Sequence, residues 1–117
     1  MPRPVAVTPL LADLGVVAGQ RVVLLSFEHY EDWSDLRFAR IDEGADRPIA
    51  RRVPAADAWT LTTDLGIFEV VDTVGRGDRS FSNGEVRIQP ALVAGTSVRV
   101  TVHVTPDSAP LGANVTA

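Results

Sequence analysis

The residues best suited to chemistry lie in one short run, residues 28–34, which reads EHYEDWS. Carboxylates beside an imidazole, as in Glu28 and His29, are what metal sites and acid–base pairs use. Successive residues of a strand point to opposite faces, so Glu28 would share a side with Tyr30 but not with His29. We therefore assign no catalytic, cofactor or metal residue here, and we interpret the run as the acidic, solvated end of a hairpin.

The same run carries candidate contact residues for a ligand or a partner. Sugar faces stack on exposed aromatic rings, and Tyr30 and Trp33 would supply a platform of two rings. Glu31 and Asp32 would border this platform with carboxylates. We keep these four residues, at the tip of the expected hairpin, as a candidate contact site.

A second candidate lies in residues 75–85, where three glycines predict a flexible hairpin tip. Arg76, Gly77 and Asp78 spell the tripeptide that integrins recognise. Oxygen ligands of the kind that Ca²⁺ prefers are carried by Asp72, Asp78, Asn83 and Glu85. Their spacing matches no EF-hand and two arginines oppose a cation, so we keep Arg76 and Asp78 as contact candidates and assign no metal.

Composition excludes several classes of function. The chain of 117 residues has a formal charge of -4, no cysteine and no lysine. The absence of cysteine excludes disulfides and thiolate metal sites, and without a basic stripe we expect no nucleic-acid partner. No apolar run approaches the roughly 18 residues of a membrane span and no signal peptide is evident, so we expect no membrane partner and a cytoplasmic location. Neither a nucleophile elbow nor a glycine-rich phosphate loop is present, so we expect no enzyme and no cofactor.

The elements that would position the candidate residues are strands. Residues 21–42 alternate as two strands folded back across a turn at residues 31–34, with apolar residues on both faces at the start. Farther along, Trp59 and Leu61 share one phase and are expected in the core. The clearest alternation, in residues 97–105, places four valines on one face.

Such segments predict one all-β domain over residues 1–117 with seven to nine short strands. We expect a two-sheet antiparallel β-sandwich, with a small β-barrel or a jelly roll as the alternative. Three prolines restrict residues 1–14 to an N-terminal arm. The lack of periodicity in residues 106–117 predicts a flexible C-terminal tail.

Four segments carry a resemblance to known domains. They are FEHYEDW at residues 27–33, the pattern Trp59-x-Leu61-x-x-Asp64-x-Gly66, VRIQP at residues 86–90 and VRVTVHV at residues 98–104. Over residues 15–105 the chain resembles small immunoglobulin-like β-sandwich domains of actinobacterial proteins of unknown function, and its lysine-free composition is typical of a GC-rich genome. The resemblance implies a fold only and carries no functional residue across.

Two hypotheses about function follow. The first is a non-catalytic β-sandwich module for protein–protein contact or an accessory structural role, with weak homodimerisation by edge-to-edge or face-to-face contact. The second, the alternative, is a small-ligand binder for carbohydrate or Ca²⁺ that uses residues 28–34 or residues 75–85.

Overall fold

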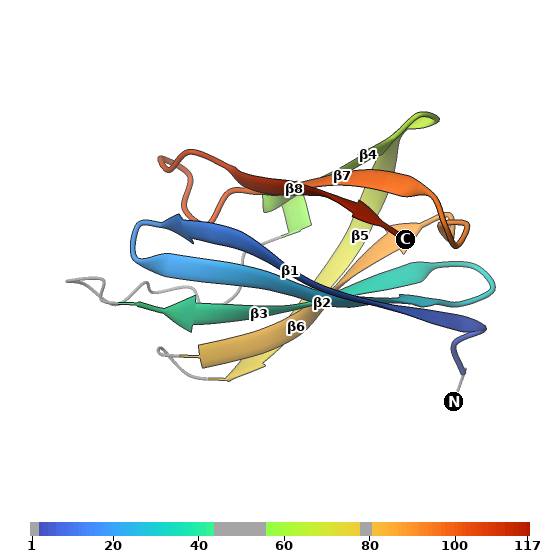
Figure 1. Ribbon diagram of the computed structural model, residues 1–117, viewed down its shortest axis with the longest axis horizontal. Helices are drawn as coiled ribbons and strands as arrows, with labels where there is room; N and C mark the ends of the chain where they lie inside the picture. The colour runs from blue at the N-terminus through green and yellow to red at the C-terminus, as the bar shows by residue number, and fades with distance from the viewer. Residues whose placement is uncertain (1–2, 44–55, 78–80) are drawn as a thin grey trace.

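The fold is built from antiparallel strands. A computed structural model of the chain describes residues 3–43, 56–77 and 81–117. In these ranges the elements are β1 (Ala6–Val17), β2 (Gln20–His29), β3 (Ser34–Asp42), the 3₁₀ turn η1 (Ala56–Ala58), β4 (Trp59–Thr63), β5 (Gly66–Gly77), β6 (Phe81–Gln89), β7 (Ser97–Val102) and β8 (Leu111–Thr116) (Figure 1). No helix in the described ranges is long and apolar enough to span a membrane.

The strands form one sheet that nearly closes on itself. Its order is β1-β2-β3-β6-β5-β4-β7-β8, and every neighbouring pair is antiparallel. β5 joins the two halves of the sheet, β1-β2-β3-β6 and β4-β7-β8. Its residues 66–68 pair with β4 and its residues 69–77 pair with β6. Figure 1 shows β5 running obliquely from one layer to the other. At the two ends of the order β8 lies beside β1, where a Cβ added to Gly15 would lie 3.9 Å from Leu111 Cδ2.

This order corrects the expected architecture. The fold is all-β, and the eight strands formed by the described residues fall within the predicted seven to nine, but the two-sheet sandwich is not confirmed. The barrel expected as the alternative fits, since β5 is continuous between the halves and leaves one sheet that curls round the core. Alternation along a strand shows which side chains share a face, but it does not show that one strand pairs in both halves.

The core fills the interior of the curled sheet with inward side chains from successive strands. The predicted core position of Trp59 is confirmed, and its ring lies 4.8 Å from that of Phe38, tilted by 49°. Three of the four valines predicted on one face, Val98, Val100 and Val102, are buried on β7. The strand ends at Val102, three residues earlier than expected, and Val104 beyond it is only partly buried against the core. Core side chains that are at most 1% exposed are Val22, Leu24, Phe27, Leu36, Phe38, Leu61, Val86, Ile88, Val98, Val100 and Val102.

The hairpin of β2 and β3 keeps the predicted turn but not the simple alternation. Tyr30 N–H donates to the Trp33 carbonyl at 2.7 Å and closes the turn. An irregularity in the register between Leu24 and Ser26 shifts the inward phase of β2, so Leu24 is buried before it and Phe27 after it. A β-bulge of this kind adds one residue to one strand, and alternation counted from the start of the strand then fails beyond it.

Three segments expected to be irregular belong to strands. Residues 6–14 of the expected arm lie in β1, which is the first strand in the sheet order, and residues 111–116 of the expected tail form β8. Residues 75–77 and 81–85, expected in a flexible loop, continue β5 and β6. Residues with low strand propensity, mostly Gly, Ala, Asn and Pro, obscure the alternation of apolar and polar residues in these segments. Pairing with a neighbouring strand stabilises them as strands.

Candidate functional site

Outward side chains of four neighbouring strands line a cleft on the outer face of the sheet. The strands β2, β3, β6 and β5 lie side by side, so residues opposite one another form rows across them. One row is Glu28, Asp35, Arg87 and Asp72, and the next contains Arg37, Glu85 and Val74. Together with Tyr30 these side chains line a cavity of about 370 Å³, which we call the polar cleft.

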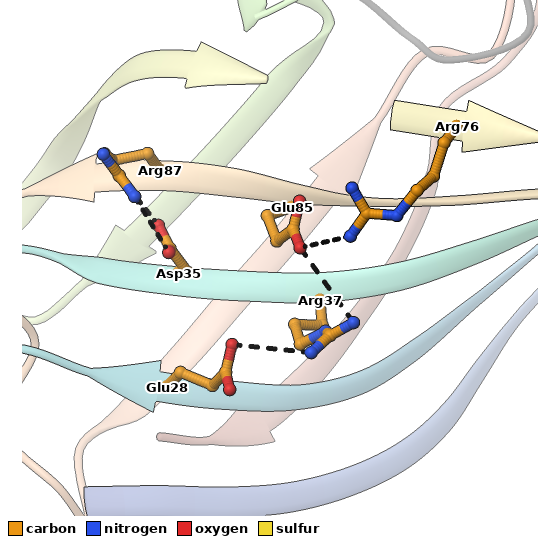
Figure 2. A network of polar contacts seen from close by, with 6 residues as sticks. All are labelled: Glu28, Asp35, Arg37, Arg76, Glu85 and Arg87. Carbon is orange, nitrogen blue, oxygen red and sulfur yellow. Dashed lines mark hydrogen bonds and ion pairs between the residues drawn. The ribbon is translucent and has the colours of Figure 1, made fainter. Parts of the chain in front are cut away.

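One ion pair fixes the part of the cleft nearest the β2–β3 turn (Figure 2). Arg87 donates from Nε and Nη2 to the two carboxylate oxygens of Asp35, at 3.0 and 3.2 Å. The side chain of Asp35 is only 7% exposed, and a carboxylate buried to this extent requires a charged partner. Hydrogen bonding to Asp35 raises the pKa of the Arg87 guanidinium.

A second group of charges forms a chain across the four strands (Figure 2). Arg76 Nη2 donates to Glu85 Oε1 at 3.1 Å. Arg37 lies between Glu85 and Glu28, with nitrogen–oxygen separations of 4.0 and 3.8 Å. Both separations exceed hydrogen-bond range. Within the residues that the structure describes, the guanidinium of Arg37 is therefore ion-paired but makes no hydrogen bond.

Aromatic side chains lie at the turn end of the cleft. The rings of Tyr30 and Trp33 are stacked, with centroids 4.8 Å apart and planes 21° apart. Arg87 Cζ lies 4.5 Å from the centroid of the Trp33 ring, which makes a cation–π contact. Burial, followed by the charges of Glu28 and Asp35, raises the pKa of the Tyr30 phenol. The phenol therefore keeps its proton and can donate a hydrogen bond into the cleft.

The predicted contact residues fall at two places on this surface. Residues 30–33 lie in the turn, where Glu31 and Asp32 are exposed. Arg76 lies on β5, where it is held by an ion pair on a strand and not in a flexible loop. Asp78 lies outside the described residues. The two stretches that the sequence offered as alternative sites are thus connected by one cleft.

Three charged side chains of the cleft, on β3 and β6, were missed by the sequence analysis. They are Asp35, Arg37 and Arg87, and they point outward beside Glu85, which the sequence offered only as a possible calcium ligand. A signal was present, because opposite charges alternate with buried residues along both strands. What the alternation does not show is that β3 and β6, which are far apart in the sequence, are neighbours.

A further polar cluster is buried instead of exposed. His29 Nδ1 lies 2.8 Å from Ser34 Oγ, and the same hydroxyl accepts the N–H of Leu92 at 2.9 Å. A base beside a hydroxyl is how serine nucleophiles are activated, but Ser34 is 0% exposed and no substrate could reach it. We therefore interpret the pair as a link between the hairpin and the segment that contains Leu92.

The charges of the cleft are arranged in pairs and not around a common centre. Guanidinium groups separate Asp35 from Asp72 and Glu28 from Glu85 along the rows and the ion-pair chain. Within the described residues, no group of three or more His, Cys, Asp or Glu side chains is placed to hold a metal ion.

The chain was compared with protein families, with curated proteins and with solved structures, and none of the three comparisons found a match. What the chain does must therefore be inferred from its own cleft and turn.

Proposed function

We propose that the chain is a non-catalytic module that contacts a protein partner through residues 30–33 together with Arg87, a surface that we call the hairpin end. The observation that supports this proposal is the stack of Tyr30, Trp33 and Arg87 on the outer face of the sheet. Tyr, Trp and Arg are the residue types that supply most of the binding energy in protein interfaces. None of these three side chains is buried in the core.

The hairpin end is also ordered before any partner binds. Arg87 is held by Asp35, and the turn is closed by the hydrogen bond from Tyr30 to Trp33. Side chains that are already fixed lose less conformational entropy on binding, which leaves more of the contact energy for affinity. The exposed carboxylates of Glu31 and Asp32 form an acidic rim, which favours a partner with basic side chains at the same position.

A site-specific crosslinking experiment tests the proposal. A photoreactive amino acid replaces Asp32 in one variant and Thr60, an exposed residue of β4, in the other. We expect position 32 to crosslink to a partner in extracts of the source organism, and position 60 not to do so. Trp33→Ala should abolish the crosslink, whereas Leu65→Ala, which removes an apolar side chain that is 84% exposed, should leave it intact.

Affinity measured with the purified partner completes the test. Truncation of an interface hot spot costs about 2 kcal/mol or more, so Trp33→Ala should weaken binding roughly 30-fold or more. Equal crosslinking from positions 32 and 60, or unchanged affinity in a folded Trp33→Ala protein, would exclude the hairpin end as the contact surface.

A further inference from the structure

The centre of the polar cleft offers a second binding surface, next to the hairpin end. Its side chains are Glu28, Arg37, Asp72 and Glu85, which we call the cleft floor. Arg37 is 39% exposed and makes no hydrogen bond within the described residues, while carboxylates stand 3.8 and 4.0 Å from it on both sides. The cleft floor therefore presents unbonded donors directly beside acceptors.

The charges of the cleft decide which ligands can bind there. An anion would approach four carboxylates, and the guanidinium of Arg87 is already bonded to one of them. A cation would have to lie beside Arg37, in the position between Glu28 and Glu85 that this guanidinium already occupies. A neutral ligand avoids both repulsions, because it carries no net charge for the carboxylates or for Arg37 to repel.

Hydrogen bonding narrows the class of ligand further. A hydroxyl group donates one hydrogen bond and accepts others, so one ligand hydroxyl can accept from Arg37 and donate to Glu28 or Glu85 at the same time. Charge-assisted bonds of this kind are roughly twice as strong as neutral ones. Several hydroxyls on one small ring would match the donors and acceptors that alternate across the cleft floor.

We propose that the cleft floor binds a neutral saccharide, with Arg37 donating to its hydroxyls, Glu28 and Glu85 accepting from them, and the Tyr30 ring as the apolar wall. The cavity of about 370 Å³ lies in the range of small-ligand sites, roughly 300–1,000 Å³. The proposal goes beyond the protein contact at the hairpin end. The two surfaces share the Tyr30 ring, but the side chains that would hydrogen-bond the saccharide all lie on the cleft floor.

Chemical-shift titrations of the ¹⁵N-labelled protein test this inference. The probes are glucose, galactose, N-acetylglucosamine, maltose and cellobiose, with sodium sulfate as the anionic control and ethylammonium chloride as the cationic one. We expect at least one sugar to shift the amide signals of Glu28, Arg37 and Glu85 in a saturable manner. Sulfate and ethylammonium should not produce saturable shifts at these residues.

Matched variants assign the binding to the cleft floor. Arg37→Met keeps the length of the side chain and removes the donors, and it should weaken sugar binding at least tenfold. Arg99→Met, at an exposed position on β7, should leave it unchanged. If Arg37→Met does not fold, Glu85→Gln gives the same test, because it removes one charged acceptor and should also weaken binding.

Three results would overturn the proposal. The first is that none of the sugars produces saturable shifts. The second is an unchanged affinity for sugar in a folded Arg37→Met protein, and the third is saturable binding of the charged probes but of no sugar. Trp33→Ala separates this proposal from the protein contact: it should abolish the crosslink to a partner and leave the sugar-dependent shifts at Arg37.

Discussion

Trp59 is 3% exposed and packs against Phe38, whereas Trp33 is half-buried between Tyr30 and Arg87 on the outer face. Trp59→Ala should destabilise the protein by about 3–5 kcal/mol, as large core truncations do. Trp33→Ala removes one ring pair and one cation–π contact, each of which contributes about 1 kcal/mol, so its effect should be smaller. Urea denaturation of both variants measures the difference. An equal or larger loss in Trp33→Ala would contradict the assignment of Trp33 to the surface.

His29 makes stability depend on pH. Its ring is 3% exposed and burial lowers its pKa below the ordinary value of 6.5. The unfolded chain therefore binds a proton at His29 more readily than the folded one. Between the lowered pKa of the folded protein and 6.5, the stability of the fold rises with pH. The contribution of His29 to stability should be complete above pH 6.5 and should be lost as the pH falls towards its lowered pKa.

Melting curves between pH 5 and pH 7 measure this effect, which His29→Gln should reduce. His103→Gln is the matched control, because His103 is exposed on the surface. A wild-type pH slope that His103→Gln reduces and His29→Gln does not would contradict the role given to His29.

Single residues could be placed from the sequence where apolar and polar residues alternate, and not elsewhere. Trp59 and the valines of β7 were placed correctly for this reason. Arg40 was not, because a charged residue in an inward position resembles a break in the phase. It is 2% exposed, and it is held in the interior by hydrogen bonds to Gln20 and Ser82, the latter at 3.0 Å. Those partners come from other strands, and a buried charge cannot be inferred without them.

At the scale of elements, β8 is part of the sheet and not a tail. Its alternate residues Leu111, Ala113 and Val115 pack against the core, and Ala117 beyond it is 2% exposed. The same alternation was present in the sequence, but small residues and a glycine weakened it. Pairing with β7 supplies the stabilisation that local propensity does not.

Paired substitutions in β8 test this arrangement. Val115→Asp would place an unpaired charge against the core and should destabilise the protein by about 2 kcal/mol or more. Asn114→Asp, one residue earlier on the exposed side, should change stability by about 0.5 kcal/mol or less. Similar melting temperatures for the two variants would indicate that the segment is not packed against the core.

The polar cleft forms only when four strands pair side by side, and for this reason its position could not be predicted from the sequence. The β2–β3 hairpin was predicted with its turn residues, since it is local in sequence. The pairing of β3 with β6 joins residues about fifty positions apart, such as Asp35 and Arg87. Only this long-range pairing places the charges of the cleft beside the aromatic residues of the turn.

On the scale of the whole molecule, the sheet is nearly closed and β1 is at one end of its order. The outward residues Val5, Val7 and Leu11 are 74%, 55% and 77% exposed, and all are apolar. Because β8 lies beside β1, another chain would approach β1 on its outer face, where these apolar side chains are exposed. Burial of apolar side chains on this strand would contribute about 25 cal/mol for each Å² removed from water.

We expect this surface to support weak self-association. Two copies that meet through β1 bury the same apolar side chains on both sides, as a twofold dimer requires. Association costs about 4 kcal/mol or more in lost translational and rotational freedom, so a small surface gives a dimer only at high concentration. In sedimentation experiments the average mass should rise above 12.5 kDa with concentration. Val7→Glu should abolish this rise because it places charges opposite each other, and Leu65→Glu, at a site that is 84% exposed, should not. A wild-type protein that stays monomeric, or equal association of the two variants, would remove β1 as a dimer surface and leave the hairpin end and the cleft as the binding surfaces proposed for the chain.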